Sequence, residues 1–356
     1  MRFIAKYRHI ITVVIAVFCF AGLFFAGKRM KELKNPDVNA DTFSGTAMGT
    51  AVRKTIYAEN RTKSEQVDAV IDDCLEETEK QISVRLSDSV VAKCNRNYAV
   101  DGIYEMPLDL LEYVEKELEI FRETEGAFSP CIRPIADLWG IEDGNDTVPE
   151  EKTIEEMLKV CDASNIEVED GGIIFHEDDM AIDFGAVGKG IAGDRIVSEL
   201  QKTDIQGAVV SVGGSIAVYG NKGDGRPWHI GIQDPRGQTG EVFGVIDIEG
   251  NKMISTSGDY EKYFEADGKR YHHIFDPTTG YPADNGLISV TIVSDNGFLS
   301  DALSTACFVL GLEKGMAYAE EKNVDAVFVT SQKEVYVTGG MKKAFRIQSD
   351  QYHVKK

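Results

Sequence analysis

The sequence predicts an α+β fold with mixed, mainly antiparallel sheets flanked by helices. The pair Asp267-Gly268, between two segments rich in aromatic residues, is the strongest short-range signal for a tight β-hairpin. Helical and strand-like segments do not alternate in the regular order that a doubly wound parallel sheet requires. The chain has 356 residues and is 43% hydrophobic, which is enough to form a large core.

Apolar periodicity locates the individual elements. Apolar residues three and four apart predict helices, whereas short apolar or alternating runs bounded by turn residues predict strands. We expect helices at 64–82, 107–125, 154–162, about 188–200, 301–311 and 312–322, and a loop at 83–95. Strands are expected at 43–58, 173–175, 180–184, 208–219, 228–232, 242–247, 253–264, 270–275, 287–293, 326–330 and 335–338. Ser300 is expected to cap the helix that begins at Asp301, because serine is a favoured N-cap.

Charge and cysteine content exclude some classes of protein. The formal net charge is −21, and residues 1–34 carry +6, so subtracting this segment leaves −27 on the remainder. Nucleic-acid binding needs a basic surface, so we expect no nucleic-acid partner. The 6 cysteines show no CxxC and no metal-type spacing. We therefore expect no essential disulfide framework and no zinc site.

The N-terminus indicates a membrane segment. A short basic segment, residues 1–9, precedes residues 10–27, an uncharged and mostly apolar run of 18 residues. This length is near the lower limit for a transmembrane helix, and a cleaved signal peptide is the alternative. A poorly formed cleavage site favours the uncleaved anchor. A linker at 28–42 follows, and residues 346–356 form a C-terminal tail.

Residues 253–281 combine histidines, carboxylates and two turns within a short span. Strand alternation places His273 on one face of the return strand and His272 and Ile274 on the other. Asp276 follows at the strand end, beside a turn that contains proline and glycine. Strand ends next to rigid loops often carry catalytic groups. A structural hairpin with a surface histidine accounts for these residues equally well.

A second region is rich in glycine. Gly185, Gly188 and Gly190 are expected to form the turn into a helix, and the free N–H groups of a helix N-terminus attract phosphate. Lys189 adds a cation there. No Walker A sequence is present, so the loop alone is a weak indication of nucleotide binding.

Four segments together resemble the signature of the FAD:protein FMN transferases, the ApbE-type flavin transferases. They are GTAMGT at 45–50, AIDFGAVGKGIAGD at 181–194, TSGDYEKYF with YHHIFDPTTGYP between 256 and 282, and SDALSTACFVLG at 300–311. They stand in the family's order, and the resemblance runs from about Phe43 to about Gly340. It implies a T-fold-related catalytic domain over 43–345, on the extracytoplasmic side of the cell membrane.

The resemblance also implies the residues of the site. Those expected to contact FAD are Met48, Ala127, Phe128, Ser129, Asp183, Lys189 and Ile274. Those expected to hold Mg²⁺ are the backbone carbonyl of Ala186, the Asp301 carboxylate and the Thr305 hydroxyl. Asp301 and Thr305 lie four apart on one helical face, and oxygen ligands suit this cation. Ser129 departs from the family's usual GAFDPT, because it replaces the acid.

The implied reaction is Mg²⁺-dependent transfer of the FMN moiety of FAD to a Thr or Ser hydroxyl of an acceptor protein, with release of AMP. A hydroxyl needs a base, and His273, with an ordinary pKa of about 6.5, suits that role. Asp276 is expected to orient His273, and His272 is expected to be structural. Two alternatives remain: an FAD diphosphatase that uses water as acceptor, and a non-catalytic exported flavin-binding protein.

Overall fold

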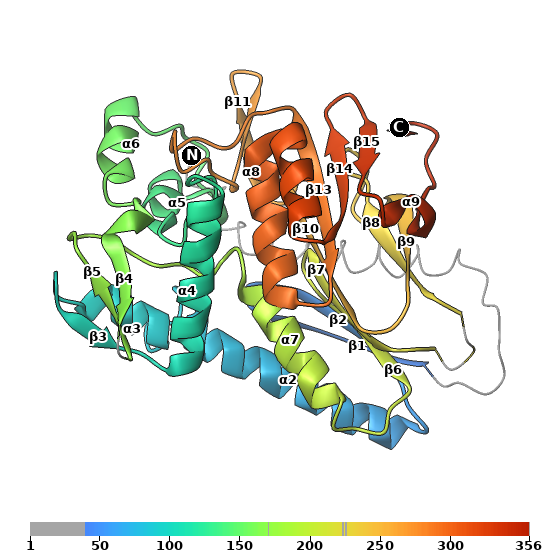
Figure 1. The fold of residues 1–356 in the computed structure, drawn as a ribbon. Coiled ribbons are helices and arrows are strands. Elements are labelled where there is room, and N and C mark those ends of the chain that lie inside the picture. Colours follow the sequence, from blue (N-terminus) through green and yellow to red (C-terminus); the bar gives the residue numbers. More distant parts are fainter. Residues whose placement is uncertain (1–39, 170, 223, 225, 356) are drawn as a thin grey trace, which may run out of the picture.

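A nine-stranded sheet forms the centre of the part of the chain that the structure describes, residues 40–169, 171–222, 224 and 226–355 of a computed structural model (Figure 1). Its order is β1-β2-β6-β7-β10-β13-β14-β15-β17. All neighbouring strands in it pair antiparallel except β15 and β17, which are parallel. The strands are β1 (Ala40–Ala47), β2 (Thr50–Tyr57), β6 (Gly207–Val212), β7 (Ser215–Gly220), β10 (Lys252–Gly258), β13 (Leu287–Ser294), β14 (Asp325–Thr330), β15 (Glu334–Val337) and β17 (His353–Val354).

Different layers cover the two faces of this sheet. Helices α2 (Arg61–Ile82), α7 (Gly188–Leu200) and α8 (Gly297–Glu321) pack on one face, where they bury the apolar side chains of β2, β6, β7 and β10. A three-stranded sheet of β16 (Phe345–Ile347), β9 (Val242–Ile248) and β8 (Trp228–Gln233), together with α9 (Met341–Ala344), covers the other face. The predicted α+β class with mixed, mainly antiparallel sheets is confirmed.

A second group of elements lies beside α8 (Figure 1). It contains α3 (Val90–Asn97), α4 (Leu108–Glu123) and a small sheet of β3 (Ile103–Glu105), β5 (Gly172–Phe175) and β4 (Ile166–Glu169). These elements share one hydrophobic core with α8 and β13. Helix α5 (Arg133–Trp139), helix α6 (Glu151–Leu158) and the hairpin of β11 (Tyr263–Ala266) and β12 (Lys269–His272) enclose a separate cluster around the fully buried Trp139.

The hairpin prediction at Asp267-Gly268 is confirmed. β11 and β12 pair with Ala266 opposite Lys269, and both turn residues have positive φ, 52° and 75°. This is the conformation that a two-residue turn of Asp-Gly favours. The GTAMGT segment forms a second hairpin turn, between β1 and β2, where Met48 and Gly49 have φ of 50° and 70°.

Several predicted strands differ from the structure. Residues 43–58 and 208–219 were each expected as one strand, but each folds back as a hairpin, the second at Gly213-Gly214. Residues 253–264 divide into β10 of the large sheet and β11 of the separate hairpin. Residues 180–184 are irregular, because Asp183 N–H donates to the Pro130 carbonyl (2.8 Å) instead of entering a sheet.

Two helix boundaries also differ. Helix α8 begins at Gly297 rather than Asp301, and the Asn296 side chain caps it by accepting from Leu299 N–H (2.7 Å). Ser300 is buried inside the helix, where its hydroxyl donates to Ser255 (2.7 Å). The expected loop at 83–95 contains helix α3 from Val90 onward. The expected break between 311 and 312 is present as a non-helical Gly311 inside α8.

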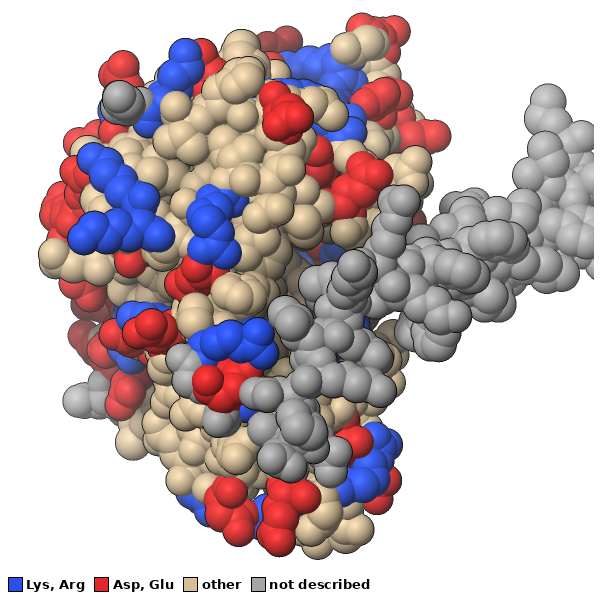
Figure 2. Space-filling model, turned by 90° about the vertical axis from the view of Figure 1, so that its right-hand side faces the viewer, with Lys and Arg blue, Asp and Glu red and all other residues tan. Residues whose placement is uncertain are grey.

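The described residues contain no helix long and apolar enough to cross a membrane, and residues 10–27, expected as an anchor or signal segment, lie outside them. The five cysteines of the described part are free thiols. On the face shown in Figure 2, acidic and basic side chains are interspersed over the described residues.

Candidate functional site

The site begins where helices α7 and α8 meet. A Cβ added to Gly190 would lie 2.0 Å from the Gly297 carbonyl oxygen, so the two backbones touch and only glycine fits there. The Asp194 carboxylate of α7 accepts from the first N–H groups of α8, Gly297 (2.6 Å) and Phe298 (3.0 Å). A carboxylate at a helix N-terminus accepts hydrogen bonds from N–H groups that have no partner within the helix. Its negative charge also interacts favourably with the positive end of the helix dipole. Asp194 therefore fixes the two helices relative to each other.

Asp301 lies one turn into α8, directly beside the start of α7. Its side chain is buried, and its two oxygens accept from Ser215 Oγ (2.8 Å) and Gly190 N–H (2.9 Å). Thr305, one turn further, is within 3.2 Å of the Ser257 hydroxyl on β10. Both side chains thus face the large sheet from one side of the helix, as the spacing predicted.

Lys189 carries the positive charge at this point. The Asp301 carboxylate raises the pKa of the Lys189 ammonium, burial opposes the shift, and Glu261, Glu142 and Asp183 add to the increase. Lys189 therefore stays protonated at neutral pH, surrounded by carboxylates. Two backbone N–H groups at the helix start already have hydrogen-bond acceptors. Gly190 N–H donates to the Asp301 carboxylate, and Gly188 N–H donates to the Phe184 carbonyl (2.7 Å). The expected attraction of phosphate thus depends on Lys189 more than on these two N–H groups.

The Asp183 segment continues from this helix start. Asp183 Oδ1 accepts from Gly185 N–H (2.7 Å), and Arg133 lies 3.3 Å from Oδ2. Burial raises the pKa of Asp183, and Arg133 opposes the shift. Ala186 follows in the same turn, with its side chain partly exposed.

The segment 127–131 lies alongside, through the bond from Asp183 to Pro130. Phe128 is buried, and Ala127 before it is partly exposed. The Ser129 hydroxyl donates to the Cys161 carbonyl (3.2 Å) and accepts from Cys131 N–H (3.2 Å). Serine here therefore closes a local turn.

Met48, from the β1–β2 turn, reaches the same helix. Its N–H donates to Glu79 (3.2 Å) on α2, and its methyl carbon would lie 3.6 Å from a Cβ placed on Gly188. The structure thus brings Met48 next to the Lys189 end of α7, although 140 residues separate them in the sequence.

The two adjacent histidines occupy different environments. His272 is buried, and both its nitrogens are engaged, since Nε2 lies 3.0 Å from the Ala283 carbonyl and Nδ1 accepts from Ile274 N–H (3.3 Å). Burial lowers the pKa of His272. Its ring packs edge-on against Phe308 of α8. With no free nitrogen, His272 is structural, and it lies on the same side as the buried Ile274.

His273 is partly exposed and has a different arrangement. Its Nδ1 lies 3.3 Å from the Lys262 carbonyl, which also accepts from His273 N–H (3.1 Å). A neutral ring with its proton on Nδ1 satisfies this carbonyl and leaves Nε2 as an acceptor. Desolvation lowers the pKa of His273, the Glu142 carboxylate opposes the shift, and Lys262 and Lys189 add to the decrease. The ring is therefore neutral at pH 7, as a base must be.

Glu142 is a site residue that the sequence analysis missed. Its carboxylate lies between Lys262 Nζ (2.5 Å) and Arg85 Nη2 (3.1 Å). Desolvation raises its pKa, but Lys262 and the other cations outweigh this effect and lower the pKa to about 2. Glu142 is therefore ionised beside His273. No local sequence pattern marks Glu142, because its partners are 57 and 120 residues away.

No hydrogen bond joins Asp276 to His273 among the described residues, and the bonds of Asp276 lie within its own turn. Its carboxylate accepts from Thr278 N–H (2.8 Å), and its own N–H and the Gly280 N–H close the same turn. Within the described residues, the side-chain partner of His273 is the Lys262 carbonyl. Asp276 shapes the turn that follows the histidine, and Lys262 orients the ring.

Lys189 interacts electrostatically with several of these residues. The carboxylates of Asp301, Asp183 and Glu142 raise its pKa, and Lys189 in turn helps to lower the pKa of His273. The site thus contains a neutral base, a fixed cation and a buried carboxylate within an oxygen-rich set of groups. Such a set can bind a charged diphosphate and remove a proton from a hydroxyl.

Comparisons with known proteins identify the family of this chain. The family model described as "ApbE family" matches residues 48–328. The FAD:protein FMN transferase of Treponema pallidum is 31% identical over 95% of this chain and 95% of its own length, and that of Vibrio cholerae is 32% identical over 80% and 86%. Among solved structures, the ApbE protein of Thermotoga maritima has a TM-score of 0.77 and 31% identity over 86% of this chain and 100% of its own. The flavin transferase ApbE of Vibrio cholerae has a TM-score of 0.76 and 28% identity over 86% and 99%.

Proposed function

This chain belongs to the ApbE family, and from that premise we propose that it transfers the FMN moiety of FAD to a Thr or Ser hydroxyl of an acceptor protein and releases AMP. The observation that supports the proposal is the buried Asp301 carboxylate where α7 and α8 meet, bonded to Gly190 N–H directly after Lys189. The charge of Lys189 also lowers the pKa of His273. Base, cation and acidic oxygen ligand are the three groups that this phosphoryl transfer needs.

The residues present fit Mg²⁺. Asp301, Thr305 and the Ala186 carbonyl offer only oxygen donors, which Mg²⁺ prefers, and each Asp301 oxygen keeps a lone pair beside its present hydrogen bond. When bound, the cation neutralises charge that develops on the diphosphate. The close approach of Gly190 and Gly297 holds Asp301 at this position.

The transfer forms one bond and breaks one. The acceptor hydroxyl oxygen attacks the phosphorus of the FMN half, and the bond from that phosphorus to the bridging oxygen breaks, so AMP leaves with that oxygen. His273 Nε2 accepts the hydroxyl proton, while Nδ1–H stays on the Lys262 carbonyl. Lys189 stabilises the charge on the departing phosphate. The products are a phosphoester-linked FMN on the acceptor and AMP.

The test incubates the full chain with FAD, Mg²⁺ and an acceptor domain from a flavinylated protein. We expect flavin fluorescence on the acceptor band after denaturation, and no label on a matched acceptor whose target Thr is replaced by Val. Free FMN and AMP without labelled acceptor would instead indicate a diphosphatase. Unchanged FAD that stays bound would indicate a binding protein.

We also propose that residues 10–27 anchor the chain in the cell membrane, with the catalytic domain on the extracytoplasmic side. The support is the uncharged 18-residue run between basic residues. Fractionation followed by N-terminal sequencing tests this proposal. We expect an intact N-terminus in the membrane fraction, whereas a mature N-terminus after residue 27 in the soluble fraction would indicate a cleaved signal peptide.

A further inference from the structure

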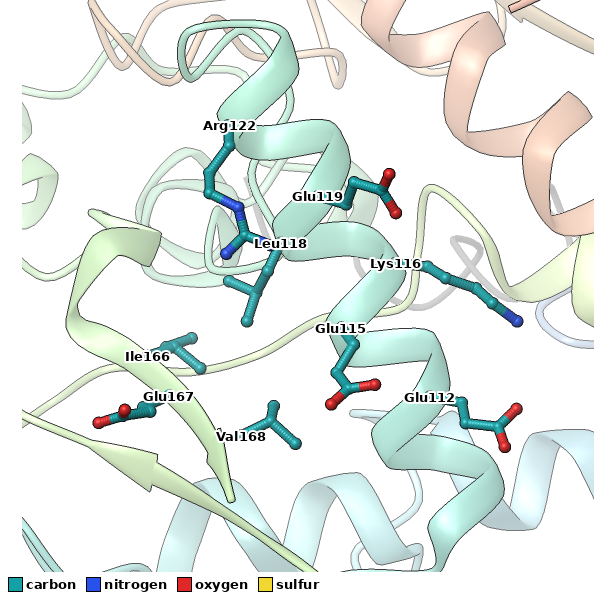
Figure 3. A pocket seen from close by; sticks show the side chains of 9 residues that line it. All are labelled: Glu112, Glu115, Lys116, Leu118, Glu119, Arg122, Ile166, Glu167 and Val168. Carbon is teal, nitrogen blue, oxygen red and sulfur yellow. The ribbon is translucent and has the colours of Figure 1, made fainter. Parts of the chain in front are cut away.

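Helix α4 has one glutamate, Glu117, on its buried, apolar face. Its buried stripe contains Leu110, Val114, Glu117, Leu118 and Ile120 together with Leu111. Glu117 is 0% exposed, and neither carboxyl oxygen has a hydrogen-bond partner among the described residues. The outer face of α4 is different, since Glu112, Glu115 and Glu119 line an open hollow of about 510 Å³ between α4 and β4 (Figure 3).

The surroundings of Glu117 belong to the predicted nucleotide site. Asp183 is its charged neighbour, and Glu117 in turn affects the Cys131 thiol. The segments that contain these two residues are bonded to each other through Asp183 N–H and the Pro130 carbonyl (2.8 Å). Leu118, next to Glu117 on the buried face of α4, shares one hydrophobic core with Phe128 and Phe184. Glu117 therefore lies on the face of α4 that packs toward the segments that hold Ala127 to Ser129 and Asp183 to Lys189.

Burial and charge decide the protonation state. An ionised carboxylate without a partner is very unfavourable in an apolar interior. Burial raises the pKa of Glu117 well above its usual value, and the Asp183 carboxylate raises it further. Glu117 is thus a neutral carboxylic acid at neutral pH.

A neutral carboxyl group in this place reduces stability relative to an apolar side chain, so its presence calls for a reason. Ser129 stands where the family's GAFDPT pattern has an acid, and it uses its hydroxyl for a local turn. Glu117, on the buried face of α4, places a carboxyl group in the core that borders this segment.

We propose that Glu117 is a positioning residue of the flavin-nucleotide site, which in its neutral form supports the Asp183 segment and the turn at 129–131 from behind. The inference rests on the proposed function, because those segments are assigned to FAD there. Ionisation of Glu117 would place a second negative charge beside Asp183 and the diphosphate, and this would weaken FAD binding.

The test measures FAD affinity of the full chain by fluorescence quenching between pH 6 and 9, without an acceptor. The variants are Glu117→Gln, Glu117→Ala and the control Glu119→Gln, an exposed residue of the same helix. We expect Glu117→Ala to weaken FAD binding by about tenfold or more at pH 6, as the loss of a supporting side chain behind a site does. Glu119→Gln should match the wild type throughout.

The Gln variant separates positioning from folding. It keeps the shape and cannot ionise, so we expect wild-type affinity at pH 6 and tighter binding than the wild type at any pH at which the wild-type carboxyl group ionises. The titratable neighbours Asp183 and Cys131 are unchanged in it, so the difference reports Glu117. Because the pKa is raised in the folded state, wild-type stability falls as pH rises above the unfolded value of about 4.3, and Glu117→Gln should remove that decrease.

Two results overturn the inference: wild-type FAD affinity in a folded Glu117→Ala variant, or equally weakened FAD affinity in folded Glu117→Gln and Glu117→Ala variants. The same experiments distinguish failure of the transferase proposal from failure of the role of Glu117. If these affinities behave as expected while no acceptor is labelled, the transferase proposal fails alone. If the acceptor is labelled and the affinities do not differ, the role of Glu117 fails alone.

Discussion

Replacing each of the two adjacent histidines by alanine should produce opposite results. His273→Ala removes a partly exposed ring whose side-chain bond to Lys262 is long, 3.3 Å, so we expect a loss of stability below about 1 kcal/mol. A positioned general base contributes about 10² to 10⁴-fold to rate. Transfer should therefore fall by that factor while FAD affinity changes little, because Lys189, Met48 and the Asp183 segment remain.

His272→Ala should instead destabilise the fold. The buried ring contacts Phe308, and its loss leaves the Ala283 carbonyl without its 3.0 Å partner. An unpaired buried polar group and a cavity together cost about 2–4 kcal/mol. Activity per folded molecule should remain within a few-fold of the wild type.

The assay pairs single-turnover labelling of the acceptor with FAD titration and thermal melting of each variant. The reasoning is refuted if His272→Ala is folded but inactive, since the wrong histidine would then face the site. It is also refuted if His273→Ala loses FAD binding rather than turnover, because His273 would then be a nucleotide contact.

Three further predictions concern the surrounding residues. Asp301→Asn should raise the Mg²⁺ concentration needed for half-maximal activity by about tenfold or more, since a charged ligand is lost; an unchanged Mg²⁺ titration would remove Asp301 from the metal site. Glu142→Gln should lower the rate a few-fold and move the acidic limb of the pH–rate profile to lower pH, because Glu142 opposes the decrease in the pKa of His273; a limb that moves upward would contradict this. Gly190→Ala should destabilise the protein by about 1–3 kcal/mol in chemical denaturation, because the new methyl would meet the Gly297 carbonyl at 2.0 Å; wild-type stability would mean that the helices do not touch.

Local signals in the sequence predicted local structure well. The Asp267-Gly268 turn requires positive φ at both residues, and both have it. The strand expected at 270–275 ends at His272, so His273 follows β12, and the two rings bond to different carbonyls, Ala283 and Lys262. Helix spacing placed Asp301 and Thr305 on one face of α8. These features depend on backbone geometry within a few residues, which is why a single sequence reveals them.

Features that depend on distant partners were not predicted. Ser300 and Asn296 are both favoured N-cap types, and Asn296 caps α8, while the Ser300 hydroxyl bonds to Ser255 on β10. Glu142 acquires its importance only when the fold brings Lys262 and Arg85 to it. The residues next to Ser300 and Glu142 in the sequence do not indicate these contacts.

The most direct test of the account is the intact mass of an acceptor domain after reaction with FAD, Mg²⁺ and this chain. We predict a mass increase of one FMN less one water on the target Thr or Ser, with one AMP released per labelled acceptor. An unmodified acceptor mass, accompanied by release of FMN and AMP in equal amounts, would contradict the account.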